Sequence, residues 1–125
     1  MNEADGRVIR SDERGYGVLR YGRGTVERII GPEIGARQVD FHVNRIRSGS
    51  PRGPYHLHPG SENVYYVLSG ELVVRIRGTD HRLGPGDAAF VKAGVPHSAS
   101  NLGSVDVELI EIYAPAEPGF VEISE

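Results

Sequence analysis

Short stretches of alternating apolar and polar residues, separated by turns rich in glycine and proline, run along most of this chain. The 17 glycines and 8 prolines among 125 residues are spread through the sequence and do not form a low-complexity segment. Alternation with a period of two is typical of β-strands that bury one face. Turns that recur roughly every 8–12 residues favour an antiparallel sandwich or barrel. The sequence therefore predicts an all-β domain without a long helix.

The clearest strand is expected over residues 39–47, where Val39, Phe41 and Val43 alternate with polar neighbours. Further strands are expected over 55–58, 63–68, 72–77, 88–91 and 105–113. The polar positions of such strands are expected to face solvent, and this places His42 on the surface, together with His81 beside a hairpin tip. An apolar interior is predicted, lined by Phe41, Val43, Leu72, Val74 and Phe90.

Composition excludes several classes of protein. The net charge is −3, and basic residues alternate with acidic ones, which argues against a nucleic-acid-binding surface. The absence of cysteine excludes disulfides, a thiolate metal site and a thiol nucleophile. No apolar run approaches the length of a membrane span, and the first residues lack the pattern of a signal peptide. We therefore expect a cytoplasmic protein that does not bind a membrane.

Four side chains suited to binding a metal stand in two short segments. His56, His58 and Glu62 fall within seven residues, and His97 follows about forty residues later. Two histidines separated by one residue on a strand point to the same face, because side chains alternate. Imidazoles with a carboxylate suit one divalent transition metal: iron, manganese, nickel, zinc or copper.

These two segments resemble the paired motifs of the cupins. His56, His58, Glu62 and Gly70 fit the first motif, G-x5-H-x-H-x3–4-E-x6-G. The second motif, G-x5-P-x-G-x2-H-x3-N, is matched by Gly86, Gly94, His97 and Asn101, with Lys92 in the place of its proline. The resemblance covers about residues 39–115. It implies an antiparallel β-barrel of the jelly-roll or double-stranded β-helix type, with a metal inside and frequently a homodimer, but it does not imply a reaction.

One position departs from the family pattern. The carboxylate ligand usually stands seven residues before the glycine that ends the first motif, and Asn63 occupies that position, one residue after Glu62. A shift of one residue on a strand reverses the direction of a side chain. Either a bulge turns Glu62 inward, or the site consists of three histidines with Asn63 or water nearby. The variable spacing in the motif favours Glu62 as the fourth ligand.

Other residues are candidates for contact with a ligand. Aromatic side chains of the strands are expected to line the pocket, where a phenol beside the metal could bind an oxyanion or relay a proton. Glu108 and Glu111 lie on opposite faces of the last strand, so at most one of them is expected to point inward. An arginine that faced inward would indicate an acidic substrate. The pocket residues predicted are Phe41, Tyr65, Tyr66 and Phe90, and no catalytic residue is assigned.

Three segments are expected: an arm over residues 1–38 that pairs with the sheet of a partner chain, a barrel over 39–115, and a tail over 116–125. The exposed edges of a barrel sheet favour such pairing, so we expect a homodimer. The first hypothesis for function is a metalloenzyme that oxygenates, decarboxylates or isomerises a small organic molecule by Lewis-acid chemistry. The alternative is a small-molecule binding or sensing module that uses the same metal pocket.

Overall fold

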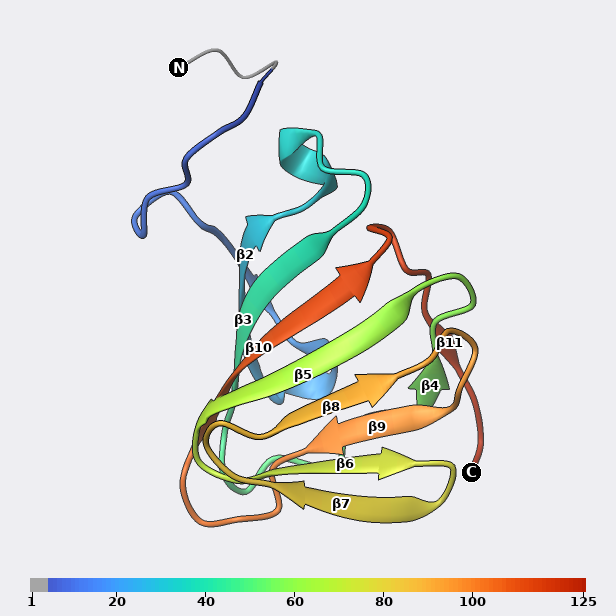
Figure 1. Cartoon of the computed structure of the whole chain (residues 1–125). Coiled ribbons are helices and arrows are strands. Elements are labelled where there is room, and N and C mark those ends of the chain that lie inside the picture. The colour runs from blue at the N-terminus through green and yellow to red at the C-terminus, as the bar shows by residue number, and fades with distance from the viewer. Residues whose placement is uncertain (1–4) are drawn as a thin grey trace.

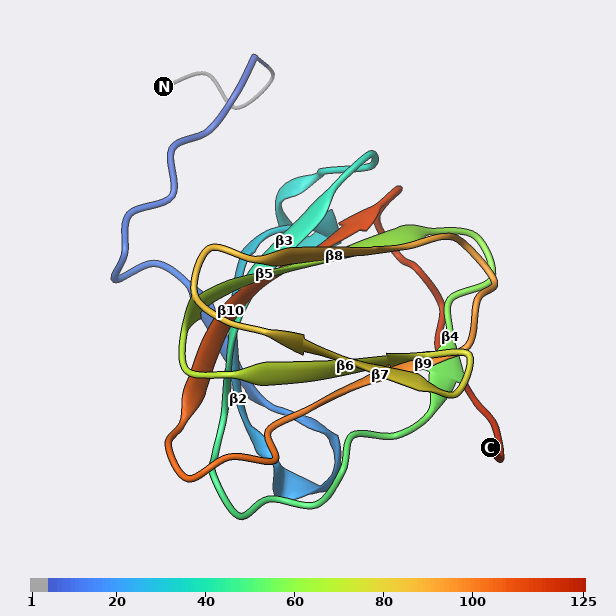
Figure 2. The ribbon, with the colours of Figure 1, turned by 60° about the horizontal axis from the view of Figure 1, so that its bottom comes forward.

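The computed structural model describes residues 5–125, which form two facing antiparallel β-sheets (Figures 1 and 2). This confirms the predicted all-β class. No helix among the described residues is long and apolar enough to cross a membrane. The helical segments there are two 3₁₀ turns, Arg20–Gly22 and Pro32–Ile34.

The larger sheet has six strands in the order β1-β2-β3-β10-β5-β8. Their bounds are Gly15–Val18 for β1, Gly24–Ile30 for β2, Asp40–Ile46 for β3, Val107–Ala114 for β10, Glu62–Ser69 for β5 and Ala88–Val91 for β8. The smaller sheet has five strands in the order β11-β4-β9-β6-β7. Their bounds are Val121–Glu122 for β11, His56–Leu57 for β4, His97–Ser100 for β9, Leu72–Ile76 for β6 and Thr79–Leu83 for β7.

The space between the sheets is apolar at one end and polar at the other. Along β10 the inward positions begin with Val107 and Leu109, both fully buried, and continue with buried Glu111. The same change occurs on β3, where buried His42 and Asn44 precede Ile46. The apolar end forms the core, which is built by Ile46, Tyr65, Val67, Leu72, Val74, Leu83, Val91, Ala99, Val107 and Leu109.

Leu72 and Val74 lie in the core as predicted, but the predicted orientation of β3 is wrong. Phe41 faces away from the interior, and its neighbour His42 is only 7% exposed. Phe41 pairs with Ile112, Ile112 pairs with Val64, and Val64 pairs with Phe90, so these side chains form an apolar row across the outer face. The alternation of β3 was predicted correctly, but its polar face lies inside.

The expected arm contributes two strands to the sheet of its own chain. Antiparallel pairing joins β1 to β2 and β2 to β3. The expected tail also joins a sheet of its own chain, because β11 pairs with β4. This pairing brings residues 118–120 over the polar end of the interior. Both ends of the described chain therefore help to form the walls around that end.

Candidate metal centre

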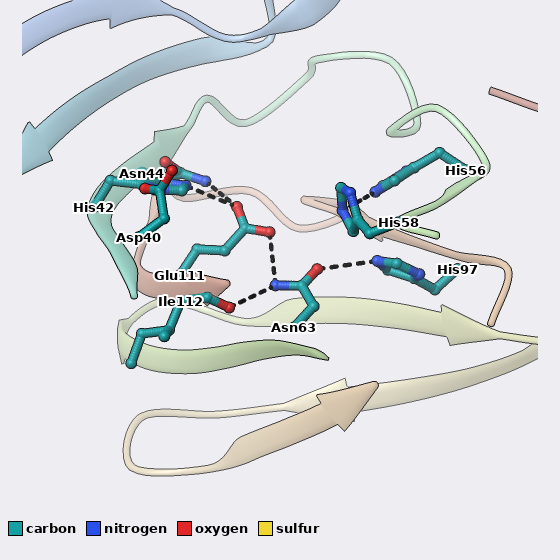
Figure 3. A network of polar contacts seen from close by, with 9 residues as sticks. All are labelled: Asp40, His42, Asn44, His56, His58, Asn63, His97, Glu111 and Ile112. Atoms are coloured by element: carbon teal, nitrogen blue, oxygen red, sulfur yellow. Dashed lines mark hydrogen bonds and ion pairs between the residues drawn. The ribbon is translucent and has the colours of Figure 1, made fainter. Parts of the chain in front are cut away.

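Three buried histidines converge at the polar end, as their spacing predicted (Figure 3). His56 lies on β4 and pairs directly with His97 on β9, while His58 follows β4 on the same side. The exposed fractions are 7% for His56, 3% for His58 and 1% for His97. One nitrogen from each ring lies within 4.8 Å of the others, which is close enough for a single metal ion to contact all three.

Backbone carbonyls orient each imidazole. The Nδ1 atoms of His56 and His97 donate hydrogen bonds of 2.8 Å to the carbonyl oxygens of Pro54 and Val95, and His58 Nδ1 donates to Gly119. A neutral imidazole carries one N–H, so these bonds leave each Nε2 lone pair directed at the cluster. Burial lowers the pKa of His56 to about 4 and also lowers that of His97. These shifts favour the neutral form of His56 and His97, which is the form that binds a metal.

The structure does not bring Glu62 to the histidines. Its side chain is exposed on the outer face of β5, whereas Asn63 is 1% exposed and points inward. No bulge interrupts the pairing of β5 with β8 or with β10 at this position, so strand alternation alone sets the two directions. Asn63 Oδ1 lies 3.0 Å from His97 Nε2. An amide oxygen, and not the carboxylate of Glu62, therefore lies beside the histidine cluster.

The close atoms of this cluster are electron-pair donors that face one another. His56 Nε2 lies 3.2 Å from His58 Nε2, and Asn63 Oδ1 lies 3.0 Å from His97 Nε2. With each N–H directed at a backbone carbonyl, no proton remains to join these atoms, and their lone pairs repel. A cation among them would convert that repulsion into attraction. The donor set, three imidazole nitrogens and one carbonyl oxygen, fits a divalent first-row transition metal.

Asn63 is held in this orientation by a buried carboxylate that the sequence analysis did not assign. Glu111 accepts hydrogen bonds from Asn63 Nδ2 at 3.1 Å and from Asn44 Nδ2 at 2.8 Å, and its Oε1 lies 3.2 Å from His42 Nε2 (Figure 3). Burial alone would raise the pKa of Glu111, but the hydrogen bonds and the charge of His42 lower it to about 2. Glu111 is therefore an ionised group at the centre of the network.

His42 carries the compensating charge, and its predicted surface position is wrong. Its ring lies between Asp40, at 3.2 Å from Nδ1, and Glu111. Burial disfavours the protonated ring, but the two carboxylates raise the pKa of His42 to about 9. Asn44 also turns its amide nitrogen toward Glu111, and this leaves its buried Oδ1 without a partner among the described residues. The polar network is thus arranged around the negative charge of Glu111.

A cavity of about 580 Å³ opens beside this network. Of the four predicted pocket residues, Tyr65 lines it, whereas Phe41, Tyr66 and Phe90 do not. Tyr66 and Phe90 are 40% and 54% exposed, because alternation on β5 and β8 turns them outward. Burial raises the pKa of Tyr65 well above its usual value, so its phenol stays protonated.

The sequence analysis missed further residues around this cavity. Phe120 stacks on His56 with 4.6 Å between the ring centroids, and the Arg20 guanidinium lies 3.8 Å above the Phe120 ring. Arg23 and Arg28 also line the cavity. They stand in the N-terminal segment that was expected to form an arm, and no sequence motif marked them. Only the pairing of β2 with β3 brings them to the site.

Comparison with known proteins agrees with the motifs and the fold. The pattern of the cupin domain matches residues 43–113, more than half of the chain. The chain belongs to the cupin family. This cupin is 31% identical over 118 residues to the "oxalate-binding protein" of Thermotoga maritima, an alignment that covers 90% of this chain and 97% of that protein.

Solved structures have the same architecture as this cupin. A predicted oxalate decarboxylase from Thermotoga maritima superposes with a TM-score of 0.72 at 30% identity, covering 87% of this chain and 99% of that one. The polyketide cyclase RemF from Streptomyces resistomycificus gives a TM-score of 0.79 at 18% identity, covering 95% and 86%. The latter likeness concerns the fold alone, which supports different chemistries.

The site of this cupin combines neutral ligand atoms with positively charged walls. Three imidazoles and an amide leave the charge of a bound divalent ion uncompensated by the ligand atoms themselves. Around the cavity, Arg20, Arg23, Arg28 and protonated His42 outnumber the carboxylates of Asp40 and Glu111. Both features favour an anionic ligand at the open side of the site.

Proposed function

We propose that this cupin binds one divalent transition-metal ion through His56, His58 and His97, and that it uses this centre to bind a small organic molecule with a chelating pair of oxygen atoms. The observation that carries the proposal is the convergence of three imidazole Nε2 atoms from rings whose Nδ1 atoms each donate to a backbone carbonyl. When bound, such an ion would supply Lewis-acid stabilisation of negative charge on an oxygen of the ligand.

The favoured function is an enzyme that oxygenates, decarboxylates or isomerises its substrate. The protein groups that could assist are on the cavity wall. Tyr65 keeps its phenolic proton and could donate a hydrogen bond to an oxyanion. Phe120 covers one face of His56 and limits access of water to that ring.

The alternative is a binding or sensing module that does not catalyse a reaction, and a specific observation favours it. Glu111 is the carboxylate nearest the histidines in the network, but its oxygens accept three hydrogen bonds and its pKa is lowered to about 2. A carboxylate stabilised in this way is a weak base at neutral pH. The relative named for binding oxalate is consistent with this second function.

Metal analysis of the purified protein tests the shared part of both functions. We expect about one equivalent of metal in the wild type and in His81→Ala, because His81 is exposed on β7. His97→Ala should lose most of the metal, because it removes one of three converging ligands. Full metal content in the His97→Ala variant would contradict the proposal.

Separate reconstitution with iron, manganese, nickel, zinc and copper then distinguishes the two functions. Each form is incubated with diketones, catechols and keto-acids, and the products are followed by mass spectrometry. Turnover by any metal form that is lost in His97→Ala supports the enzyme. Measurable ligand affinity without turnover by any form supports the binding module.

A further inference from the structure

Arg23 is a buried cation without a carboxylate partner. Its side chain is 8% exposed and lines the cavity, yet it forms no ion pair within residues 5–125. Its Nη1 donates to the carbonyl oxygen of Ala99 at 3.0 Å, and its Nε donates to that of Arg20 at 3.3 Å. Neither acceptor carries a charge, and Nη2 has no hydrogen-bond partner among the described residues.

The backbone around Arg23 is shaped to hold this guanidinium in place. A Cβ at Gly53 would lie 2.2 Å from the Ala99 carbonyl oxygen and 2.9 Å from Arg23 Nη1, so only glycine leaves room for their hydrogen bond. Gly24 allows a second close approach, because a Cβ there would lie 1.8 Å from the Arg45 carbonyl oxygen. These two glycines allow β2 and residue 53 to come close enough to fix Arg23 at the cavity.

Burying a guanidinium without a negatively charged partner lowers the stability of the folded protein. Glu111 attracts it through the cavity without direct contact, and this compensates only part of the charge. The planar fork of arginine matches the two oxygens of a carboxylate or phosphate, and Nη2 remains available for such a group. The missing partner is therefore expected to be an anion that enters the cavity.

The anion at Arg23 would lie apart from the metal centre. Arg23 donates a hydrogen bond to the carbonyl of Ala99, which stands two residues after His97 on β9, so a strand rise of about 7 Å separates the backbone positions of Ala99 and His97. We propose that this cupin binds a small dianion, with one carboxylate at the histidine centre and a second carboxylate at Arg23. This inference rests on the proposed function and narrows its ligand to dicarboxylates longer than oxalate.

Ligand titrations of the metal-loaded protein, with manganese or zinc, test this inference. Calorimetry compares glutarate with pentanoate, which has the same carbon chain but only one carboxylate. We expect glutarate to bind at least about tenfold more tightly to the wild type, and we expect Arg23→Gln to remove this difference. Oxalate is too short to reach Arg23 from the metal, so its affinity should change less than about threefold.

Arg82→Gln is the matched control, because Arg82 is an exposed arginine on β7 that pairs with Glu71. Arg23→Lys keeps the charge but loses the fork, and it should retain part of the preference for glutarate. Equal affinity of glutarate and pentanoate for the metal-loaded wild type would overturn the inference, and this comparison needs no variant. A preference that persists in folded Arg23→Gln would also overturn it. A wild type that binds no metal would instead overturn the proposed function and, with it, this inference.

Discussion

Glu111 on β10 fixes the direction of the Asn63 amide on β5. Its Oε2 accepts a hydrogen bond from Asn63 Nδ2 at 3.1 Å, and the carbonyl oxygen of Ile112 accepts a second bond at 3.2 Å. Because the amide nitrogen is held on one side, Oδ1 points at His97 Nε2 on the other side (Figure 3). A residue that does not touch the three histidines thus determines which atom is offered beside them.

The first prediction concerns Glu111→Gln, which removes the buried negative charge and replaces one acceptor oxygen with a donor. We expect metal affinity to fall by about tenfold, as is common when groups that orient ligands are lost. The unfolding free energy should fall by about 3 kcal/mol, since His42 loses a buried partner. Chelator competition measures the first effect and denaturant unfolding of the metal-free protein measures the second.

Glu108→Gln is the control for this substitution. Glu108 lies on the same strand, but it faces outward and pairs with exposed Arg45 at 2.7 Å. Its replacement should leave metal affinity unchanged, because surface ion pairs contribute little. Equal metal affinity in Glu111→Gln and Glu108→Gln would show that Glu111 does not orient the site.

The second prediction concerns the pH dependence of stability. The folded-state pKa of His42 is raised from 6.5 to about 9, so the folded protein binds a proton that the unfolded chain has released between these values. Stability from this group is fully present below pH 6.5 and is lost as the pH rises through 9. The size of the effect is on the order of 3 kcal/mol.

Denaturant unfolding at pH 6, 7.5 and 9 measures this loss in the metal-free protein. His42→Gln keeps a donor near Glu111 but cannot titrate, so its stability should vary much less over the same range. The titration depends on Asp40 and Glu111, which face the two ring nitrogens. A wild-type stability that is constant from pH 6 to 9 would disprove the ion pair.

The strands β3, β4, β5, β6, β8 and β10 and the histidine cluster could be predicted because they depend on local sequence. His56 and His58 share a face through simple alternation, and the second motif marks His97. Glu62 shows the limit of that reasoning, since an error of one residue reverses the facing of a side chain. The motif spacing allowed Glu62, whereas the unbroken pairing of β5 turns Asn63 inward.

The polar network could not be predicted, because it depends on pairing between distant strands. His42 stands directly opposite Glu111 in the register of β3 and β10, although 69 residues separate them. Taken alone, the alternation of β3 identifies a polar and an apolar face but not which of them is inside. Pairing with β10 buries the polar face around Glu111 and leaves Phe41 outside. Arg23 reaches the site through pairing of the same kind, between β2 and β3.

The third prediction concerns Phe120, which stacks on His56 and lies beneath the Arg20 guanidinium. Phe120→Ala should leave the metal content intact, since the ligand atoms and their backbone partners remain. It should admit water to one face of His56 and raise the dissociation rate of the metal several-fold. Stopped-flow release to a chelator measures this rate. Val121→Ala is the control, because Val121 follows Phe120 directly and its side chain is exposed.

The fourth prediction is a homodimer, with a second copy covering the outer face of the six-stranded sheet. Tyr66, Leu68 and Phe90 are 40%, 40% and 54% exposed on this face. Phe90 belongs to the apolar row with Val64, Ile112 and Phe41, and Tyr66 and Leu68 extend the apolar surface along β5. A contiguous apolar surface of this kind is unusual on a monomer. Light scattering at micromolar concentration should therefore give about twice the mass of 13.6 kDa.

Two variants test how that dimer is held together. Phe90→Lys introduces a charge into the apolar row and should yield monomers, while Val105→Lys, at an exposed loop position, should remain dimeric. Truncation before Gly15 tests whether the residues that precede β1 hold the two copies together, because β1 and β2 already pair within their own chain. If Phe90→Lys stays dimeric and the truncated chain becomes monomeric, the arm joins the two copies, and the sheet face does not. If the wild type is a monomer, both modes of assembly are wrong, and the apolar row must be explained by another partner.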